Sequence, residues 1–515
     1  MMQRALTFAA CAALSGCLVG PDYKRPDFYA PPTYSTDFEI SQTGDRLWWR
    51  GFRDPALDAV VEKALAENQQ IVAALDRLEA VNANVRATQA DLFPRFDGTV
   101  SREERLFVTD PANPGQPGSG DPQEAGDTTT RIDGISRLVF SPDFFGRTRR
   151  SVEFARANRR AQIFAILDLR RAIASGVASR YIDLRRIDAR TRLLEQSLEL
   201  QLQTLEIVRK RRSAGLAADL DVRRAEADLA RTRAQQGALM NARARAAFDL
   251  AVLLGEAPSA ASDLPGRSTI PRYIAGPPIG VPAELIRRRP DVQQTEAFLI
   301  AATAEIGIET ADLYPSLRIP GSVTLDLGGT IDRTELVGTI SSVIDIPLFD
   351  AGRRRAEIRG AKARARAAVS DYEQSVLSAL ADVEIALVGI NAAELQLREF
   401  QSAVESSEYA FDQLTALYRE GLATFIDILD AQRTLIANRE AYVDAEAAAA
   451  ISVVDLYFAV GSPTGTPETE AARLSRPARK SLFRAIEALE QPSETESTPE
   501  ATGHNGTGAP LNQSN

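Results

Sequence analysis

Side chains that usually carry enzyme chemistry are scarce in this chain of 515 residues. It contains one histidine, His504, and two cysteines, Cys11 and Cys17. Imidazole and thiolate are the commonest general base, nucleophile and metal ligand in proteins. The sequence also has no glycine-rich phosphate loop and no cluster with metal-ligand spacing. These absences predict a protein that is not an enzyme and that holds no metal ion and no cofactor.

Free positive charge is lacking as well. The chain has 60 Lys and Arg against 70 Asp and Glu, a formal net charge of −10, and no basic cluster stands free of acidic neighbours. No nucleic-acid partner is therefore expected. Acidic pairs are plentiful, and two carboxylates suffice for a glycosidase. On amphipathic helices, however, such pairs usually belong to a solvated face.

Long apolar runs are missing beyond the N-terminus. The most apolar late stretch, Ala447–Val460, is too short to cross a bilayer and contains Asp455. No transmembrane helix is therefore expected in the body of the chain. A membrane-spanning part must consist of strands, which need only about 9 to 11 residues to cross at a tilt.

The first residues have the layout of a secretory signal. Arg4 is followed by the apolar run Ala5–Leu14 and then by Ser15-Gly16-Cys17, which looks like a bacterial lipobox. Residues 1–16 are expected to be a cleaved signal peptide, and Cys17 is expected to carry a covalent diacylglycerol and an N-acyl chain. Leu18 after the cysteine favours delivery to the outer membrane by the bacterial sorting rule. The alternative is an ordinary signal peptide with an incidental cysteine.

The sequence contains two tandem copies of one pattern. The stretch Gly146–Gly215 recurs as Gly352–Gly421, with landmarks offset by 206 residues. Upstream, Ala90–Pro94 resembles Ala311–Pro315 at an offset of 221, so the first copy holds 15 additional residues, which fit a Pro/Gly-rich loop. Ala/Arg/Glu-rich helices look alike by composition, but ordered landmarks in register favour a structural repeat.

Each repeat is expected to contain a helix, a strand pair and two long helices. An extended, proline-restricted arm at 17–53 precedes the first repeat, 54–257, in which Asp54 is the expected N-cap of a helix that runs to about Leu92. A connector at 258–281 leads to the second repeat, 282–461. The acidic tail at 462–515 is too polar to bury a core and is expected to be disordered.

The strands and long helices are predicted from two different periods. Apolar and polar residues alternate in the strands, and apolar residues recur near every 3.5 positions in the helices, a spacing typical of supercoiled packing. Gly215 and Gly421 are the expected C-terminal turns of the first long helix of each repeat. From pattern alone, a soluble β-hairpin explains the alternation equally well. The expected strands are 95–107, 129–141, 317–328 and 335–347, and the expected long helices are 148–212, 217–255, 352–420 and 424–460.

One constellation suggests a site. Asp427 and Asp430 lie three residues apart, on one helical face just after the turn at Gly421. Acids near a helix N-terminus are stabilised by the helix dipole, and this is the purely structural explanation. If several copies surround an axis, the same carboxylates form stacked anionic rings at a constriction and favour cations.

Several motifs give the chain a family resemblance. They are Cys17 with Gly20-Pro21-Asp22-Tyr23-Lys24-Arg25-Pro26, Phe52 to Asp58, Arg288-Arg289-Pro290-Asp291-Val292, and Asp427 to Leu435. With these motifs the chain resembles the TolC-like outer-membrane efflux proteins, and specifically their lipoprotein branch of the OprM and NodT kind. The resemblance covers nearly everything from Cys17 to about Gly461.

The resemblance implies a mainly α fold with a transmembrane β part. In a homotrimer, each protomer would give four strands to a twelve-stranded outer-membrane β-barrel and long helices to a periplasmic α-barrel. The implied partners are a periplasmic adaptor (membrane fusion protein), an inner-membrane pump of the RND type and outer-membrane lipid. The helix tips near Gly215 and Gly421 would face the adaptor and form the exit gate.

The resemblance also assigns gate residues. Asp427 and Asp430 fall on the family's aperture acids, and Tyr418 and Asp221 fall on partners in its closed-state hydrogen-bond network. The match is incomplete, because Ala423 stands where TolC has an arginine that closes this network. Arg223 or Arg224 are candidates to replace that arginine.

The sequence therefore predicts a passive exit duct for small molecules in an outer-membrane efflux system. Two alternatives remain. The same architecture serves the export of polypeptides in type I secretion, and a lipid-anchored periplasmic scaffold of coiled helices would never cross the bilayer. The sequence does not identify the cargo.

Overall fold

The computed structural model describes residues 18–27, 47–106, 128–263, 269–273, 289–326 and 335–461. The predicted signal peptide, Cys17, most of the connector, the expected helix start at residue 282 and the tail at 462–515 lie outside these residues. The chain divides into two units, Met1–Pro467 and Glu468–Asn515. All the elements described below belong to the first unit.

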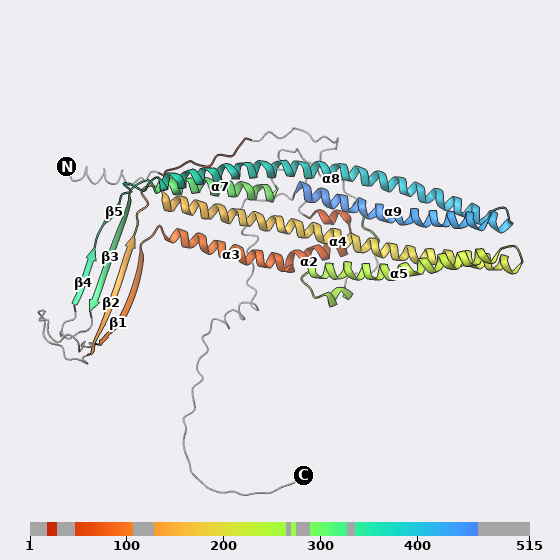
Figure 1. The fold of residues 1–515 in the computed structure, drawn as a ribbon, viewed down its shortest axis with the longest axis horizontal. Coiled ribbons are helices and arrows are strands. Elements are labelled where there is room, and N and C mark those ends of the chain that lie inside the picture. The colour runs from red at the N-terminus through yellow and green to blue at the C-terminus, as the bar shows by residue number, and fades with distance from the viewer. Residues whose placement is uncertain are drawn as a thin grey trace, which may run out of the picture. The chain divides into compact units, whose positions relative to one another are not determined.

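Four long helices dominate this unit (Figure 1). They are α4 (Arg147–Ser213), α5 (Asp219–Leu253), α8 (Arg353–Glu420) and α9 (Phe425–Val460), and their ends lie within two residues of the expected bounds. At 1.5 Å per residue, the 67 residues of α4 span about 100 Å. α4 packs against α5 and α9, and α8 packs against α9. Each repeat thus contributes one helical hairpin, α4/α5 or α8/α9.

The first helix of the first repeat is broken, contrary to the expectation of one helix ending near Leu92. Instead, α2 (Pro55–Glu67) and α3 (Gln69–Ala90) meet at Asn68, whose backbone is non-helical, with φ −60° and ψ 127°. The Asn68 side chain accepts hydrogen bonds from the N–H groups of Gln70 and Ile71 and donates one to the Leu253 carbonyl at 2.8 Å. Asn68 is 3% exposed, so this cap also joins the break to the end of α5.

Other helix starts follow the sequence more closely. Asp54 is the N-cap of α2, as predicted, and accepts hydrogen bonds from the N–H groups of Ala56 and Leu57. The second repeat's counterpart of α3 is α7 (Pro290–Ala311), which packs against α4 and α8. Proline suits the first helical position because its missing N–H would have no partner there.

The strands form one antiparallel sheet in the order β1-β2-β3-β4, with β5 also paired to β3 (Figure 1). Within the described residues, β1 of the first repeat lies at one edge and β4 of the second repeat lies at the other. The sheet is therefore made jointly by both repeats. The strands are β1 (Arg95–Leu106), β2 (Thr128–Phe140), β3 (Ser316–Asp326), β4 (Glu335–Ile340) and β5 (Val343–Asp345).

The expected single strand at 335–347 is wrong, because β4 and β5 are separated at Ser341. The Ser341 N–H donates to the Pro320 carbonyl on β3 at 3.0 Å. Proline has no N–H to return that bond, so the ladder cannot continue regularly past this pair. Pairing resumes with Val343 opposite Arg318.

One helix could cross a membrane by length and composition. Within the described part of the chain, α8 contains an apolar window of this kind with mean hydropathy 1.7, although only 39% of that window is buried. Such a window had not been expected from the sequence. In the fold, Val383, Leu387 and Ile390 of α8 pack against Leu456 and Val460 of α9 in a hydrophobic cluster.

The described part of the N-terminal arm is held between the two repeats. Arg150 of α4 has a side chain that is only 2% exposed, and it donates to the carbonyls of Val19 and Gly20 and to the carboxylate of Asp22. Gly20 lies so close to α7 that a Cβ atom there would meet the Gly307 Cα at 2.5 Å. The arm therefore fastens α4 of the first repeat to α7 of the second.

Candidate functional site

The two faces of the sheet differ in polarity. Successive residues of a strand point to opposite faces, so cross-strand pairs define rows of side chains. On one face the large apolar residues are strongly exposed, with Phe96 69%, Val100 80%, Leu336 69% and Ile340 76% exposed. Two rows on this face are Phe96-Leu138-Gly321-Ile340 and Val100-Gly134-Leu325-Leu336, and two on the other face are Asp97-Arg137-Ser322-Thr339 and Ser101-Asp133-Asp326-Glu335. Between them lie Gly98-Ser136-Val323-Gly338 on the first face and Thr99-Ile135-Thr324-Val337 on the second, so the second face is polar in most of its rows but not in all.

This arrangement suits a sheet with hydrocarbon on one side and water on the other. Exposed apolar patches of this kind are rare on soluble monomers and mark a membrane or protein interface. The polar face carries acids, hydroxyls and an arginine in register, as expected for the lining of an aqueous channel. The alternation expected from the sequence is thus a property of the whole sheet.

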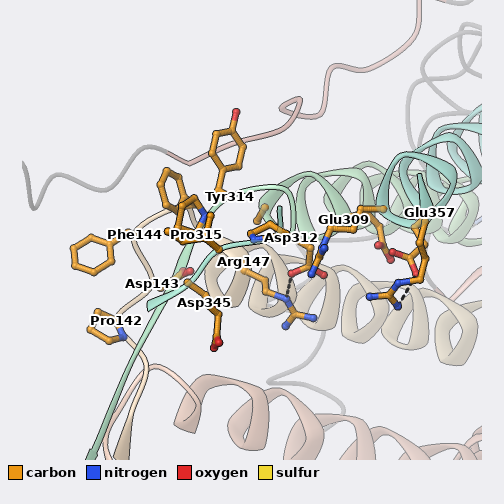
Figure 2. Close-up of a pocket in the computed structure, with 17 residues that line it drawn as sticks. Pro142, Asp143, Phe144, Arg147, Glu309, Asp312, Tyr314, Pro315, Asp345 and Glu357 are labelled. Atoms are coloured by element: carbon orange, nitrogen blue, oxygen red, sulfur yellow. Dashed lines mark hydrogen bonds and ion pairs between the residues drawn. The ribbon is translucent and has the colours of Figure 1, made fainter. Parts of the chain in front are cut away.

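A polar cavity of about 720 Å³ lies where the strands join the helices. Figure 2 shows Arg147, at the start of α4, linked to Asp312 at the end of α7, with Glu309 and Glu357 on the helical side of the cavity. The Arg147 Nε atom lies 2.6 Å from the Asp312 carboxylate. This pair connects the two repeats at the foot of the sheet.

Negative charges outnumber positive ones around Glu309 in this cavity. Burial raises the pKa of the Glu309 carboxyl, and the negative charges of Glu357, Asp312 and Glu305 raise it further. Glu305 is itself paired with Arg364 at 3.0 Å. The Glu309 carboxyl therefore takes up a proton more readily than an ordinary glutamic acid does.

At their far ends, both helical hairpins close with the same turn. Gly215 and Gly421 have φ values of +76° and +82°, which glycine adopts without strain. In both turns the residue after the glycine donates its N–H to a carbonyl five residues back, Leu216 to Arg211 and Leu422 to Leu417. The two predicted helix-tip glycines thus occupy equivalent places at the hairpin tips.

A shared hydrophobic core joins the two tips. Its buried members come from all four long helices: Leu205, Val208, Val222, Ala225, Leu229, Phe411, Tyr418, Phe425, Ile428, Leu429 and Leu435. Because both hairpins contribute to one core, the tips cannot separate without exposing apolar surface.

The structure brings Asp427 and Asp430 together on one groove of about 600 Å³ beside α8 and α9. Both acids are exposed. Asp427 also completes a capping box, because its carboxylate accepts bonds from the hydroxyl and the N–H of Thr424 at 2.6 and 2.8 Å. These bonds lower the pKa of Asp427. The capping box thus gives Asp427, but not Asp430, a structural role at the start of α9.

Tyr418 and Asp221 are near each other but not hydrogen-bonded. Tyr418 is 4% exposed, and its buried hydroxyl has no hydrogen-bond partner. Burial raises the pKa of Tyr418; the Arg211 charge opposes this rise and the Asp221 charge adds to it. Asp221 faces Arg224 at 3.8 Å, and Arg223 pairs with Asp219 and Glu226. Neither Arg223 nor Arg224 therefore bonds the Tyr418 hydroxyl.

The sequence reasoning missed Arg211, which contacts the end of α8. At the repeat offset of 206 residues, Arg211 corresponds to Leu417, so a charged residue in one copy stands opposite an apolar one in the other. This difference between the two copies is the sequence feature that could have drawn attention to Arg211. No cluster of acids, histidines or cysteines suited to a metal ion occurs in the described residues.

Comparison with known proteins gives consistent results. The family model described as outer membrane efflux protein matches residues 60–256 and 281–462. Nodulation protein T of Rhizobium leguminosarum bv. trifolii is 30% identical over 458 residues, 87% of this chain and 95% of the relative. The probable efflux pump outer membrane protein TtgC of Pseudomonas putida is 28% identical, over 90% of this chain and 96% of the relative.

A solved structure agrees with these relatives. The outer-membrane channel OprN superposes with a TM-score of 0.76 and 31% identity, over 87% of this chain and 99% of that channel. With its sheet of divided polarity and its paired helical tips, the chain belongs to the outer membrane efflux protein family.

Proposed function

We propose that the chain is the outer-membrane exit duct of a tripartite efflux pump. It conducts small molecules passively from the periplasm to the exterior and makes or breaks no covalent bonds. The single observation that carries the proposal is the sheet, because one face exposes large apolar residues while the other is mainly polar. Such a sheet suits a bilayer on one side and an aqueous passage on the other.

The duct is a homotrimer in this proposal. Open strand edges are not tolerated in lipid, and the edges of β1 and β4 have no partner strand within the described residues. Three protomers that each give four strands close a twelve-stranded barrel. The long helices then form the periplasmic tunnel, which docks on an adaptor and, through it, on an inner-membrane pump of the RND type.

Cys17 is the proposed lipid anchor. Arm residues from Leu18 onward are fixed close to the foot of the sheet, since the Val19 N–H donates to the Phe145 carbonyl. A lipid chain attached just before them would enter the membrane beside the barrel. Each methylene buried in the bilayer contributes about 0.8 kcal/mol to such anchoring.

The periplasmic gate lies at the hairpin tips. Asp427 and Asp430 share one groove near the turn at Gly421, and copies around an axis would form two anionic rings. Tyr418 and Asp221 lie in the same tip region. We assign Asp427 and Asp430 to the constriction that adaptor docking widens.

Conductance of the purified protein in planar bilayers tests this function. The double variant Asp427→Ala/Asp430→Ala is expected to lose cation preference several-fold, because the anionic rings disappear. Asp76→Ala/Glu79→Ala is the matched control, since it removes two exposed acids at the same spacing from α3. Unchanged selectivity in the first variant would remove the gate assignment. A wild-type protein that stays monomeric and conducts no current would contradict the duct itself.

A further inference from the structure

Four cations form a stripe on one face of α8, close to the sheet. They are Arg355, Arg359, Lys362 and Arg366, and all four are exposed. Because a helix turns about 100° per residue, steps of four, three and four residues keep these positions within about 60° of one another. This α8 stripe covers about 17 Å of the helix axis and begins in the first turn.

The cations of the α8 stripe lack acidic partners. Within the described residues none of the four forms an ion pair, whereas Arg353 in the same segment pairs with Glu357 at 3.3 Å. In the sequence Glu357 stands between Arg355 and Arg359, but the helix turns it about 160° away from both. The positive charge of the stripe is therefore not neutralised by its own helix.

The helix itself does not favour cations at this end. The N-terminal end of a helix carries partial positive charge, which stabilises acids there, yet the first turn of α8 has no acid and begins with three arginines, Arg353 to Arg355. Arg353 and Arg354 have acidic partners on the chain. Arg355 has none among the described residues, so an anion from outside the chain would supply the missing partner.

The α8 stripe faces away from the polar cavity at the foot of the sheet. Glu357, about 160° from the stripe, lines that cavity together with Asp345. Asp345 is paired with Ser316, which lies an even number of residues from Ser322 and so belongs to the polar face of the sheet. The stripe is therefore on the same side of the chain as the exposed apolar face.

Exposed apolar residues mark the level at which the stripe begins. Between β5 and α8, Leu348 and Phe349 are each 91% exposed, and Ile346 is 57% exposed. Such residues suit the edge of the hydrocarbon layer, beyond which the headgroups of a bilayer occupy about 5 to 7 Å on each side. Helical side chains lean toward the N-terminus of their helix, which for α8 is the end at the sheet (Figure 1). The long side chains at the start of the stripe therefore lean toward the headgroup layer.

The first repeat presents part of the same pattern. At the repeat offset of 206 residues, Lys362 and Arg366 correspond to Arg156 and Arg160 of α4, which are also exposed. Closer to the sheet an acid, Glu153, interrupts the pattern on α4. The stripe on α8 is thus the stronger of two related cationic patches.

We propose that the α8 stripe binds the phosphate groups of anionic phospholipids in the bilayer leaflet next to the helices. The lipid supplies the negative charge that the chain does not, and several copies would surround the duct with a cationic belt. This belt fixes the depth of the sheet, because a shift would either separate the charges or push the cations into hydrocarbon. The site rests on the proposed function, since headgroups lie at this level only if the sheet spans a bilayer.

Native mass spectrometry of the detergent-solubilised full chain tests the site without requiring conduction. The probes are anionic phosphatidylglycerol and zwitterionic phosphatidylcholine with the same acyl chains. Wild-type protein is expected to prefer phosphatidylglycerol. The double variant Arg355→Gln/Arg359→Gln is expected to lose about thirtyfold of that preference, roughly fivefold for each cation, while glutamine preserves the helix. An unchanged preference in this variant would overturn the proposal.

Arg231→Gln/Arg233→Gln is the matched control. It removes two exposed cations from α5, which lies away from the sheet (Figure 1), and is expected to keep the wild-type preference. An equal loss in both variants would overturn the site, because the effect would then follow net charge alone. Added salt is expected to weaken the wild-type preference, since exposed charges are screened.

Two further outcomes separate the site from another occupant and from the proposed function. If Arg355→Gln/Arg359→Gln dissociates the oligomer but leaves the lipid preference intact, the stripe is a contact between copies and the proposal is wrong. If wild-type protein prefers phosphatidylglycerol but conducts no current in planar bilayers, the duct function fails and the lipid site stands. A conducting protein without headgroup preference removes the lipid site alone.

Discussion

One side chain at the foot of the sheet, Glu309, makes the stability of the molecule depend on pH. The Glu309 carboxyl has a raised pKa because of burial and of the charges on Glu357, Asp312 and Glu305. The folded protein thus holds this proton more tightly than the unfolded chain does. Glu309 therefore costs stability progressively as pH rises from the unfolded pKa through the folded pKa.

Glu309→Gln is accordingly expected to raise the melting temperature at pH near 7. The gain should shrink toward about pH 4, where the wild-type carboxyl is also protonated. Glu305→Gln is the comparison on the same helix, because it removes only one of the charges that act on Glu309 and also breaks the pair with Arg364, so its gain is expected to be smaller. A gain for Glu309→Gln that stays constant with pH would contradict the titration.

Residues with local roles were predictable from the sequence, and those with distant partners were not. Asp54 as a cap and the glycines at the tips follow from rules about neighbouring positions. Arg211 could not be found in this way, because its partners Tyr418 and Arg419 lie more than 200 residues away. The assignments of Asp427, Asp430, Tyr418 and Asp221 to a gate remain predictions.

Among the elements, the break between α2 and α3 is fixed by one side chain. Asn68 caps α3 and also satisfies the Leu253 carbonyl at the end of α5. Asn68→Ala removes both contacts in a buried place and is expected to lower the free energy of unfolding by about 2 kcal/mol.

Chemical denaturation of the purified protein measures this loss. Asn84→Ala, at an exposed position of α3, is the control and should change stability by no more than about 0.5 kcal/mol. If Asn68→Ala were as stable as the wild type, the break between α2 and α3 would be determined by packing alone.

The strands and long helices were predicted nearly to the residue, since each has a clear period over many positions. The interruption between β4 and β5 was not predicted. It depends on Pro320 lying opposite Ser341, and register across a sheet cannot be read from one strand alone. The Asn68 break escaped for a similar reason, because the apolar period continues on both sides of it.

At the scale of the whole molecule, the N-terminal arm ties the repeats together through Arg150. Arg150→Met keeps the volume of the side chain but leaves the Val19 and Gly20 carbonyls without their donor. The arm is then expected to detach, and hydrogen exchange at the Val19 amide should accelerate about tenfold or more.

Exchange measured by mass spectrometry on arm peptides checks this expectation. Arg147→Met is the control, because the Arg147 side chain is 57% exposed and pairs with Asp312 of the second repeat rather than with the carbonyls of the arm. Exchange as slow as in the wild type would show that the close packing of Gly20 against Gly307 of α7 is enough to hold the arm.

The antiparallel order of the sheet has a consequence for pore width. Within the described residues, its edge strands β1 and β4 run in opposite directions. In the proposed ring, adjoining copies therefore pair antiparallel whatever the number of copies. Strand pairing therefore does not determine the number of copies, although the diameter of a barrel grows with its number of strands. In the proposed ring, we expect the packing of neighbouring helical hairpins to set the number of copies. Substitutions along these hairpins, far from any lipid, are therefore the means by which evolution could resize such a conduit.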